Sequence, residues 1–283
     1  MTLGTISQLW RYPVKSMGGE RIQAAPISLR GIPGDRGWAV FDETRAGITT
    51  GKRVNVLRQC SARYLTEPVA GEAPPAAQLT LPDGTSLAST SPEAARRLSE
   101  AAGRPLSMRC LGPAGTEAAP RVSSASDSPD EVRALMGILP GETEPDYSMF
   151  TAESLRALRL GNFFDAYPLH LLSDTTLRTL KGITPECDWD ERRFRANIVF
   201  ASAERTGYPE HAWEGKHLRI GEARLEVVMG CPRCVMVTLA ESGLPADPRI
   251  MRTLVRETEH IAGVYVRVTQ PGAVRVGDAI ELA

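Results

Sequence analysis

The sequence has no long apolar run and almost no excess of one charge. Without a stretch of about 18 or more apolar residues, no membrane-spanning helix is expected. The segment Met1–Thr5 lacks a charged region followed by an apolar core, so no secretory signal is expected either. The 33 basic and 34 acidic residues give a net charge of −1, which argues against broad nucleic-acid binding because that activity usually shows as a basic excess.

Cysteine and histidine are also scarce. Five cysteines in 283 residues do not make a disulfide framework, and we expect a reducing, cytoplasmic environment. The four histidines have no metal-binding spacing, and we expect packing or surface roles for them. The chain also lacks the Gly-x-Ser-x-Gly, His-Glu-x-x-His and P-loop patterns, so a hydrolase or a P-loop nucleotide site has no sequence support.

The length and the 42% hydrophobic content suffice for a buried core and about two domains. Residues 3–110 are mostly strand-like, with one helix that begins after the N-cap Ser91 and ends at Gly103. Residues 112–127 are small, polar and proline-containing, which predicts a linker. Further helices are expected after the N-cap residues Ser128 and Ser173 and between residues 247 and 260.

The other expected elements are short strands separated by Gly, Pro and Asp. They are Thr5–Arg11, Ile22–Leu29, Trp38–Asp42, Leu79–Leu81, Ile198–Ala201, Leu218–Ile220, Ala223–Met229, Val235–Leu239, Val264–Val268 and Ala279–Leu282. The pattern predicts a mainly β protein with helices, of the α+β class. We expect a β-barrel-like N-terminal domain at 1–111, the linker at 112–127, and a second β-barrel decorated with helices at 128–283.

Two cysteines with an arginine between them, Cys231, Arg233 and Cys234, form the most informative motif. A thioredoxin-like site would place this pair at the start of a helix, but Val235–Leu239 favours a strand. A structural zinc site needs two further nitrogen or sulfur ligands, for which no second motif exists. The remaining interpretations are an exposed, arginine-flanked thiolate that binds a soft metal or carries sulfur, and two ordinary buried cysteines.

Three basic segments are candidates for binding an anion. Lys15 and Ser16 precede a glycine pair, and such an arrangement holds an anion through ammonium, hydroxyl and backbone N–H groups. Arg36 points either at a ligand or at its neighbour Asp35. On an extended chain, Arg195 would share one face with the asparagine two residues later. For each segment the alternative is a solvated turn or a surface ion pair.

Five segments in this order resemble the MOSC family with its N-terminal β-barrel domain, the group that includes the mitochondrial amidoxime-reducing component and its bacterial relatives. The resemblance covers residues 3 to 283. The segments are YPVKS at Tyr12–Ser16, GDRGW at Gly34–Trp38, FRAN at Phe194–Asn197, CPRC at Cys231–Cys234 and PGAVRVGD at Pro271–Asp278.

The resemblance implies a molybdenum cofactor, a pterin dithiolene with a phosphate, between the two domains. Cys234 matches the protein ligand to molybdenum and is the expected catalytic residue, since a thiolate suits a soft metal. Arg233 beside it would favour the deprotonated thiol. Asp165 is expected near the metal. No pyridoxal phosphate is expected.

The same resemblance assigns the basic segments to the cofactor. Lys15, Ser16 and Arg36 fall on positions that hold the pterin or its phosphate. Arg195 matches another arginine in contact with the cofactor, and Asn197 lies close by. This agrees with the independent interpretation of these segments as anion-binding groups scattered along a chain of nearly neutral charge.

Several positions depart from the family pattern. Ala196 stands where relatives often have proline, Tyr167 replaces a smaller residue, and Cys231 has no assigned role. The chain has no C-x₄-C-x₂-C run for an iron–sulfur cluster. Electrons are therefore expected from a separate protein of the ferredoxin or cytochrome/flavin reductase type.

The function implied is an oxidoreductase that reduces small N-hydroxylated substrates, such as hydroxylamines and amidoximes, by means of the molybdenum cofactor. Two other functions remain open. A sulfur carrier or sulfurtransferase would use a persulfide on Cys234, and a cofactor-storage protein would bind molybdopterin without turnover.

Overall fold

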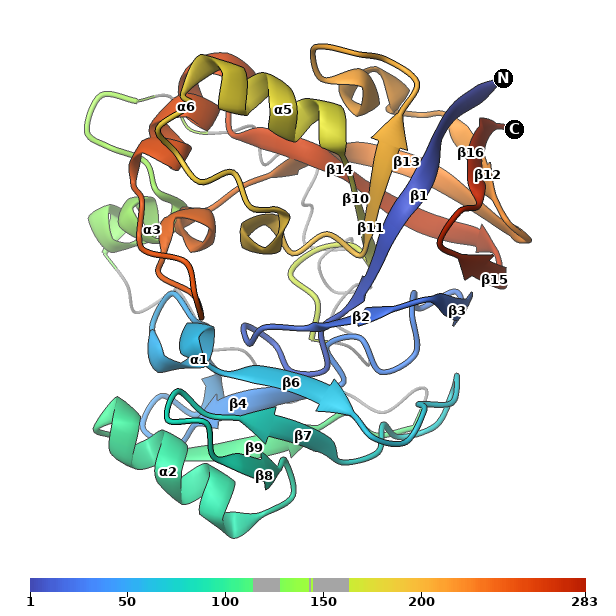
Figure 1. Ribbon diagram of the computed structural model, residues 1–283. Helices are drawn as coiled ribbons and strands as arrows, with labels where there is room; N and C mark the ends of the chain where they lie inside the picture. The colour runs from blue at the N-terminus through green and yellow to red at the C-terminus, as the bar shows by residue number, and fades with distance from the viewer. Residues whose placement is uncertain (114–127, 143, 145–162) are drawn as a thin grey trace.

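The computed structural model describes residues 1–113, 128–142, 144 and 163–283 (Figure 1). Its largest element is a seven-stranded barrel made of β1 (Thr2–Arg11), β10 (Leu169–Ser173), β11 (Ile198–Ser202), β12 (His217–Ile220), β13 (Ala223–Pro232), β14 (Ile261–Gln270) and β16 (Ala279–Leu282). The strand order is β11-β10-β14-β13-β12-β16-β1, and β1 pairs back to β11 to close the barrel. Of these pairs only β10 and β11 are parallel.

The barrel interior is filled by every second side chain of its strands, as the period of two in a strand requires. On β13, alternate residues from Ala223 to Cys231 are buried. Three of them, Ala223, Leu225 and Val227, share a core with aliphatic side chains of β14 and β16, such as Val266 and Ile280. The predicted strands at Leu218–Ile220 and Ala223–Met229 are confirmed as β12 and the first part of β13. They form a hairpin that turns at Gly221, whose φ of 54° lies in the left-handed region.

A smaller β-rich part lies below the barrel in Figure 1 and is formed by residues 12–113. One sheet contains β4 (Trp38–Asp42), β5 (Gly47–Ile48) and β9 (Leu106–Cys110), and another contains β6 (Ser61–Tyr64), β7 (Ala77–Thr80) and β8 (Ser86–Ala88). Helices α1 (Val56–Gln59) and α2 (Pro92–Ala102) belong to this part, whose core includes Val40, Leu57, Leu79 and Leu98. The short strand β2 (Glu20–Ile22) pairs with β1, and β3 (Ala24–Ile27) pairs with β15 (Gly272–Arg275).

The remaining helices lie outside the barrel (Figure 1). They are α3 (Pro129–Met136), α5 (Asp174–Ile183), α6 (Arg249–Thr258) and the 3₁₀ helices η2 (Glu191–Phe194), η3 (Pro209–Trp213) and η4 (Val235–Thr238). The predicted N-caps Ser91, Ser128 and Ser173 are confirmed, since each side chain accepts a hydrogen bond from a backbone N–H in the first turn.

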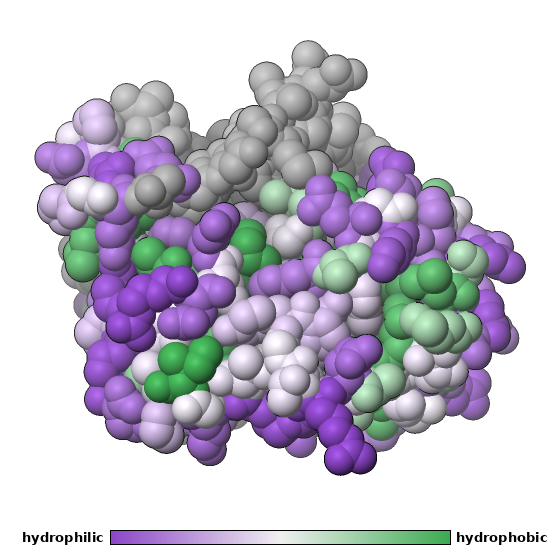
Figure 2. Space-filling model, turned by 90° about the horizontal axis from the view of Figure 1, so that it is seen from above, coloured by the Kyte–Doolittle hydropathy of each residue, from purple (hydrophilic) through white to green (hydrophobic). Residues whose placement is uncertain are grey.

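The predicted α+β class with a helix-decorated β-barrel is confirmed. Strand β1 lies in the N-terminal domain of the predicted division, yet its hydrogen bonds join it to the barrel formed otherwise by residues 169–282. The domain boundaries themselves stay a prediction, and most of the predicted linker, residues 114–127, lies outside the described residues. The face seen in Figure 2 is mostly hydrophilic, with small separate apolar patches. No helix in the described ranges is long and apolar enough to cross a membrane.

Candidate functional site

Cys234 lies where the chain leaves the barrel. Strand β13 ends at Pro232, and Cys234 is the N-cap of the four-residue helix η4. The predicted strand at Val235–Leu239 is therefore wrong. The carbonyls of Val237 and Leu239 accept hydrogen bonds from the buried Arg193 guanidinium, so they do not pair with another strand, and this contact outweighs the β propensity of the segment.

Because the segment after Cys234 is helical, strand propensity no longer excludes a thioredoxin-like site. The burial of Cys231 excludes it instead. Cys231, the first cysteine of the pair, is fully buried, whereas Cys234 is half-buried. Burial raises the pKa of the Cys231 thiol, although the neighbouring Arg233 charge and a hydrogen bond with Tyr265 oppose the shift. A reactive first cysteine needs an accessible, lowered-pKa thiol, which Cys231 does not provide.

Arg233 donates hydrogen bonds to Cys231 and to the backbone of Phe194, the residue before Arg195. Its Nη1 donates to Cys231 Sγ at 2.7 Å, and its Nη2 donates to the carbonyl of Phe194 at 2.7 Å. The sequence places Arg233 beside Cys234, but the described contacts link it to the other cysteine. Arg233 thus ties the end of β13 to the segment that carries Arg195.

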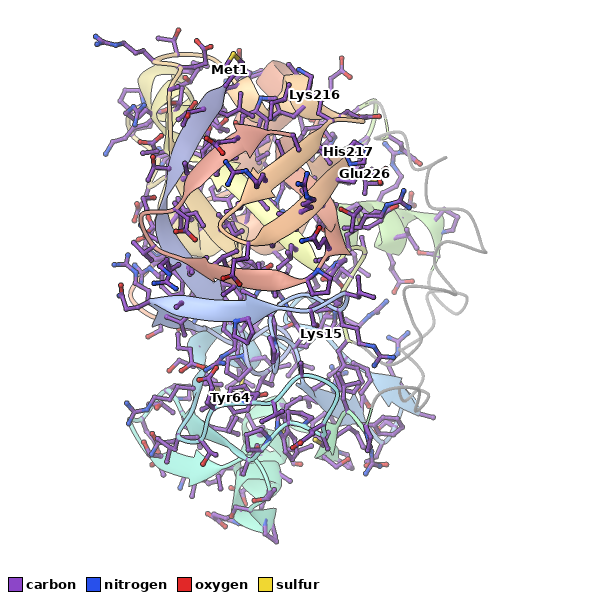
Figure 3. The ribbon with its side chains drawn as sticks, turned by 90° about the vertical axis from the view of Figure 1, so that its right-hand side faces the viewer. Met1, Lys15, Tyr64, Lys216, His217 and Glu226 are labelled. Carbon is purple, nitrogen blue, oxygen red and sulfur yellow. The ribbon has the colours of Figure 1, made fainter. Side chains whose placement is uncertain are left out.

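Lys15 lies between the barrel and the smaller part of the molecule (Figure 3). Its side chain is only 4% exposed, and its Nζ donates to the carbonyl of Phe163 at 2.9 Å and to Asp165 Oδ1 at 2.6 Å. Asp165, predicted to lie near the cofactor, is therefore joined to Lys15 across 150 positions of the sequence. The Asp165 side chain is itself 76% exposed, so this pair lies at the edge of the site.

Arg36 and Arg195 lie against the same aromatic ring. The guanidinium carbons are 4.7 Å and 4.2 Å from the centroid of Tyr12, which is buried. Cations over a desolvated ring are stabilised by its quadrupole. Arg36 also donates to Asp35 and, at 3.2 Å, to the carbonyl of Arg195. Burial lowers the pKa of Arg36, but the charge and hydrogen bond of Asp35, together with Tyr12 and Asp165, outweigh burial, and the net shift is upward.

Arg195 has an unusual environment for an arginine. Its Nη1 donates to the carbonyl of Met17, next to the predicted site residue Ser16, and its buried Nη2 has no hydrogen-bond partner among the described residues. Burial, together with the neighbouring Arg36 and Arg58 cations, lowers the pKa of Arg195 to about 10. A buried donor without a partner costs folding free energy, so Arg195 is a candidate for binding a ligand.

The prediction that Arg195 and Asn197 share one face of an extended chain is wrong. Arg195 ends η2 in the left-handed region, with φ of 55°. Asn197 is buried and bonded within the protein: its Nδ2 donates to Asp35 Oδ2 at 3.0 Å, and its Oδ1 accepts from the backbone N–H of His170 at 3.3 Å. Its described contacts organise the backbone around the cations.

Backbone strain concentrates at the predicted site. Ser16, Arg36 and Arg195 have φ values of 70°, 49° and 55°, and they are three of the six non-glycine residues with positive φ in the described part of the chain. Left-handed backbone costs about 1–2 kcal/mol at a residue with a Cβ. Such strain tends to persist at functional sites, where the surrounding structure enforces it.

Arg58 of α1 is a candidate site residue that the sequence did not reveal. It is fully buried, and its Nη2 donates to Glu241 and to the carbonyl of Met236, two residues after Cys234. Its Nε and Nη1 have no partner among the described residues. No local motif marks Arg58, because its significance depends on a contact between α1 and a segment 178 or more positions later.

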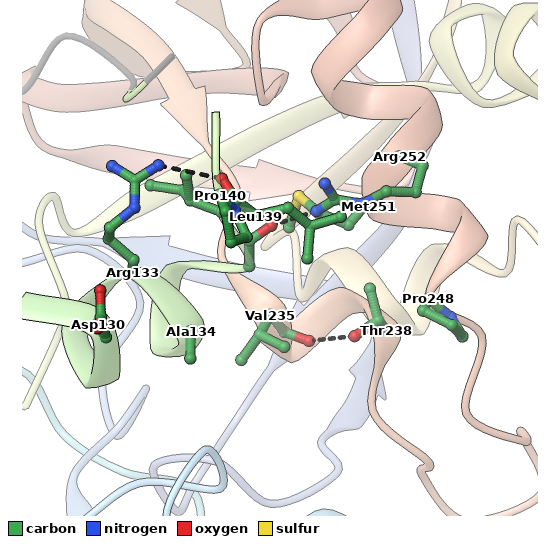
Figure 4. A pocket seen from close by; sticks show the side chains of 12 residues that line it. Asp130, Arg133, Ala134, Leu139, Pro140, Val235, Thr238, Pro248, Met251 and Arg252 are labelled. Carbon is green, nitrogen blue, oxygen red and sulfur yellow. Dashed lines mark hydrogen bonds between the residues drawn. The ribbon is translucent and has the colours of Figure 1, made fainter. Parts of the chain in front are cut away.

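A separate pocket of about 530 Å³ lies between α3, η4 and α6 (Figure 4). Its wall is mainly apolar and includes Met251 and Val235, the residue after Cys234. Arg133 and Arg252 also line it, and both are paired with acidic residues. Of the described residues that line this pocket, none belongs to the predicted site. No group of three or more potential metal-ligating side chains (His, Cys, Asp or Glu) occurs in the part of the chain that the structure describes.

Comparisons with known proteins agree with the arrangement of the chain. A model of the "MOSC domain" matches residues 159–281, and a model of the "MOSC N-terminal beta barrel domain" matches residues 3–99. Mitochondrial amidoxime reducing component 2 of Bos taurus is 26% identical over 98% of this chain and 83% of its own length. The Homo sapiens protein of that name is 27% identical, with the same two coverages of 98% and 83%.

Among solved structures, the YuaD protein from Bacillus subtilis has 14% identity and a TM-score of 0.47, and the match covers 100% of this chain and 96% of that one. The two family models together account for most of the sequence, including all five segments singled out above. The chain therefore belongs to the MOSC family and carries its N-terminal β-barrel domain.

Proposed function

We propose that this protein is a molybdenum-dependent oxidoreductase that reduces N-hydroxylated compounds, such as hydroxylamines and amidoximes. The observation that carries the proposal is the grouping of three cations from segments far apart in the sequence. Arg36 and Arg195 both contact the Tyr12 ring, and the buried Lys15 is paired with Asp165, whose charge also acts on Arg36. Arg233 connects them to the half-buried Cys234 through its bond to Phe194. The names of the relatives, amidoxime reducing components, support the same activity.

The residues present fit a molybdenum cofactor. A pterin with a phosphate and a dithiolene is an anion, and the site has more buried donors than partners. Arg195 Nη2, Arg233 Nε and two nitrogens of Arg58 lack hydrogen bonds among the described residues. An anionic ligand would supply the missing acceptors through charge-assisted hydrogen bonds.

Each residue then has a definite task. Lys15, Ser16, Arg36 and Arg195 would hold the pterin and its phosphate, and the Cys234 thiolate would bind the metal, since sulfur ligands suit soft metals. When bound, the cofactor would supply the two-electron redox chemistry that reduction of an N–OH group needs. Two electrons and two protons convert the N–OH group into N–H and water. The electrons would come from a separate ferredoxin or cytochrome/flavin reductase type protein, in a reducing, cytoplasmic environment.

Elemental analysis provides the first test of this function. Protein from a host that makes the cofactor should contain nearly stoichiometric molybdenum and reduce benzamidoxime with a chemical electron donor. Cys234→Ala should lose most of the metal and the activity. Cys110→Ala is the matched control, because Cys110 is exposed and lies on β9, in the other part of the molecule. A metal-replete parent that reduces no hydroxylamine or amidoxime would refute the proposal.

A sulfur carrier is the second candidate, and the half-buried thiol of Cys234 is the observation that favours it. A persulfide on Cys234 would appear as a mass increase of one sulfur atom, reversible by reductant, in protein without molybdenum. A storage protein would instead bind molybdopterin without reductase activity. The same preparation therefore distinguishes all three functions.

A further inference from the structure

Two buried guanidinium groups in the site have unused hydrogen-bonding capacity. Arg58 is fully buried, and its Nε and Nη1 have no partner among the described residues. Arg195 is 8% exposed, and its Nη2 is likewise without a partner. Buried donors are nearly always satisfied in folded proteins, so three such nitrogens on two cations require an explanation.

Both guanidinium groups are held in place by the backbone around the site. Arg58 Nη2 donates to the carbonyl of Met236 at 3.4 Å, which fixes it beside the turn that begins at Cys234. The Arg58 side chain lies against Gly51, where an added Cβ would come within 2.9 Å of its Cγ and Cδ. Arg195 Nη1 donates to the carbonyl of Met17, in the loop that carries Lys15 and Ser16.

The charges around these groups do not balance. Arg36 is paired with Asp35, and Arg58 is paired with Glu241. No ion pair of Arg195 occurs within the described ranges, where its main neighbours are the Tyr12 ring and a carbonyl. Both guanidinium groups interact with Tyr12: Arg195 lies 4.2 Å from the ring centroid, and Arg58 interacts with it electrostatically. The Arg58 charge is also one of the causes that lower the pKa of Arg195 to about 10. An anion between them would relieve this repulsion.

We propose that Arg58 acts with Arg195 to bind an oxyanion of the phosphate or carboxylate class. The assignment rests on the proposed function in one respect, since the anion would be either the cofactor phosphate or an acidic substituent on the N-hydroxylated substrate. Arg58 thereby becomes a binding residue supplied by the N-terminal domain, in addition to its contact with Glu241.

Inorganic phosphate is the probe for the first experiment, titrated by calorimetry into the cofactor-free full chain. The variant Arg58→Met/Glu241→Gln removes the cation together with its partner charge, so that no unpaired buried charge is left behind. We expect about a tenfold or larger loss of phosphate affinity, as for the loss of a charge-assisted hydrogen bond. Arg58→Lys keeps the charge but lacks the Nε and Nη1 donors, so it should lose phosphate affinity severalfold. Arg96→Met, at an exposed position on α2, should change nothing.

Circular dichroism and the unfolding midpoint of each variant separate binding from folding. If the double variant is folded and binds phosphate as tightly as the parent, or if the parent binds none, the proposal is overturned. If the double variant fails to fold, Arg58→Lys alone decides the question, because lysine lacks the Nε and Nη1 donors. A lowered phosphate affinity supports the proposal, and an affinity equal to that of the parent overturns it.

Protein from a host that makes the cofactor shows whether the anion is the cofactor phosphate or an acidic group of the substrate. A lower molybdopterin content in the folded double variant identifies the cofactor phosphate. An unchanged content, with a raised KM for a carboxylate-bearing hydroxamate-type substrate but not for neutral benzamidoxime, identifies the substrate. If neither changes, Arg58 has only a structural role. The phosphate titration needs neither cofactor nor activity, so its result stands even if the proposed reductase function fails.

Discussion

Asp35 accepts a hydrogen bond from Asn197 Nδ2 at 3.0 Å, although the two residues are 162 positions apart. The same carboxylate accepts from the backbone N–H of Tyr12 at 2.7 Å and from Arg36 Nη1. Asp35 is buried, so these bonds form where few waters can replace them. One carboxylate therefore connects the three basic segments and fixes the positions of the two cations that flank the Tyr12 ring.

Replacing Asp35 by Asn should destabilise the protein. The substitution preserves the shape but leaves the Arg36 charge without its anionic partner, at a side chain that is 14% exposed. We expect the free energy of unfolding to fall by about 2–4 kcal/mol, as when one member of a buried pair is removed. Urea denaturation measures the change. Asp83→Asn is the control, since its pair with Arg97 is largely exposed and should contribute little. Equal stabilities of the parent and Asp35→Asn would contradict the connecting role.

The cysteines should differ sharply in reactivity. Iodoacetamide at pH 8 should modify Cys234 first, since its half-buried thiol is still accessible. Cys110 should react more slowly, because desolvation raises the pKa of that thiol to about 11. Burial raises the pKa of Cys60 to about 12, so only about one molecule in ten thousand holds that thiolate at pH 8. Peptide mass spectrometry should find Cys60 and Cys231 labelled only after unfolding. Labelling of Cys231 in the native protein as fast as Cys234 would be inconsistent with this structure.

Lys15 and Asp165 should contribute unequally to cofactor binding. Lys15 is a buried cation that would attract the anionic cofactor, whereas the largely exposed Asp165 carboxylate would repel it. Lys15→Met should therefore lower the molybdopterin content severalfold, while Asp165→Asn should leave it unchanged or slightly raised. Fluorescence of the oxidised pterin released from purified protein measures both. A larger loss in Asp165→Asn than in Lys15→Met would indicate instead that Asp165 contacts the cofactor directly.

Local patterns predicted much of the fold. The caps at Ser91, Ser128 and Ser173 depend on neighbouring residues, and all three are confirmed. The strand predicted after Cys234 failed because the buried Arg193 side chain, 40 or more positions away, binds the carbonyls that a strand would have used. Propensity cannot anticipate a contact of that range.

The sequence motifs likewise identified only part of the candidate site. The motifs drew attention to Arg36 and Arg195, but not to Tyr12 as the ring that both contact or to Arg58 beside η4. Those relationships arise from the closure of β1 onto β11 and from the contact of α1 with the segment after Cys234. The individual roles of the predicted site residues in holding a cofactor stay predictions.

Arg195 provides a test in which stability and binding should change in opposite directions. Its pKa in the folded chain is lowered from 12.5 to about 10, mainly by burial, so the folded state holds this proton less tightly than the unfolded state does. Below pH 10 both states carry the charge and the full destabilising effect is present. The effect is relieved as the pH rises through about 10 towards 12.5.

At pH 7, Arg195→Met should therefore make the cofactor-free protein more stable. The shift corresponds to roughly 3 kcal/mol, from which the lost contacts with the Tyr12 ring and the Met17 carbonyl subtract, so a net gain of about 1–2 kcal/mol is expected. The same variant should lose most of its molybdopterin in a host that makes the cofactor. Arg193→Met is the matched comparison, because that buried guanidinium donates to several backbone carbonyls, and its loss should lower stability. Destabilisation of both variants would show that the described contacts of Arg195 outweigh the cost of its buried charge.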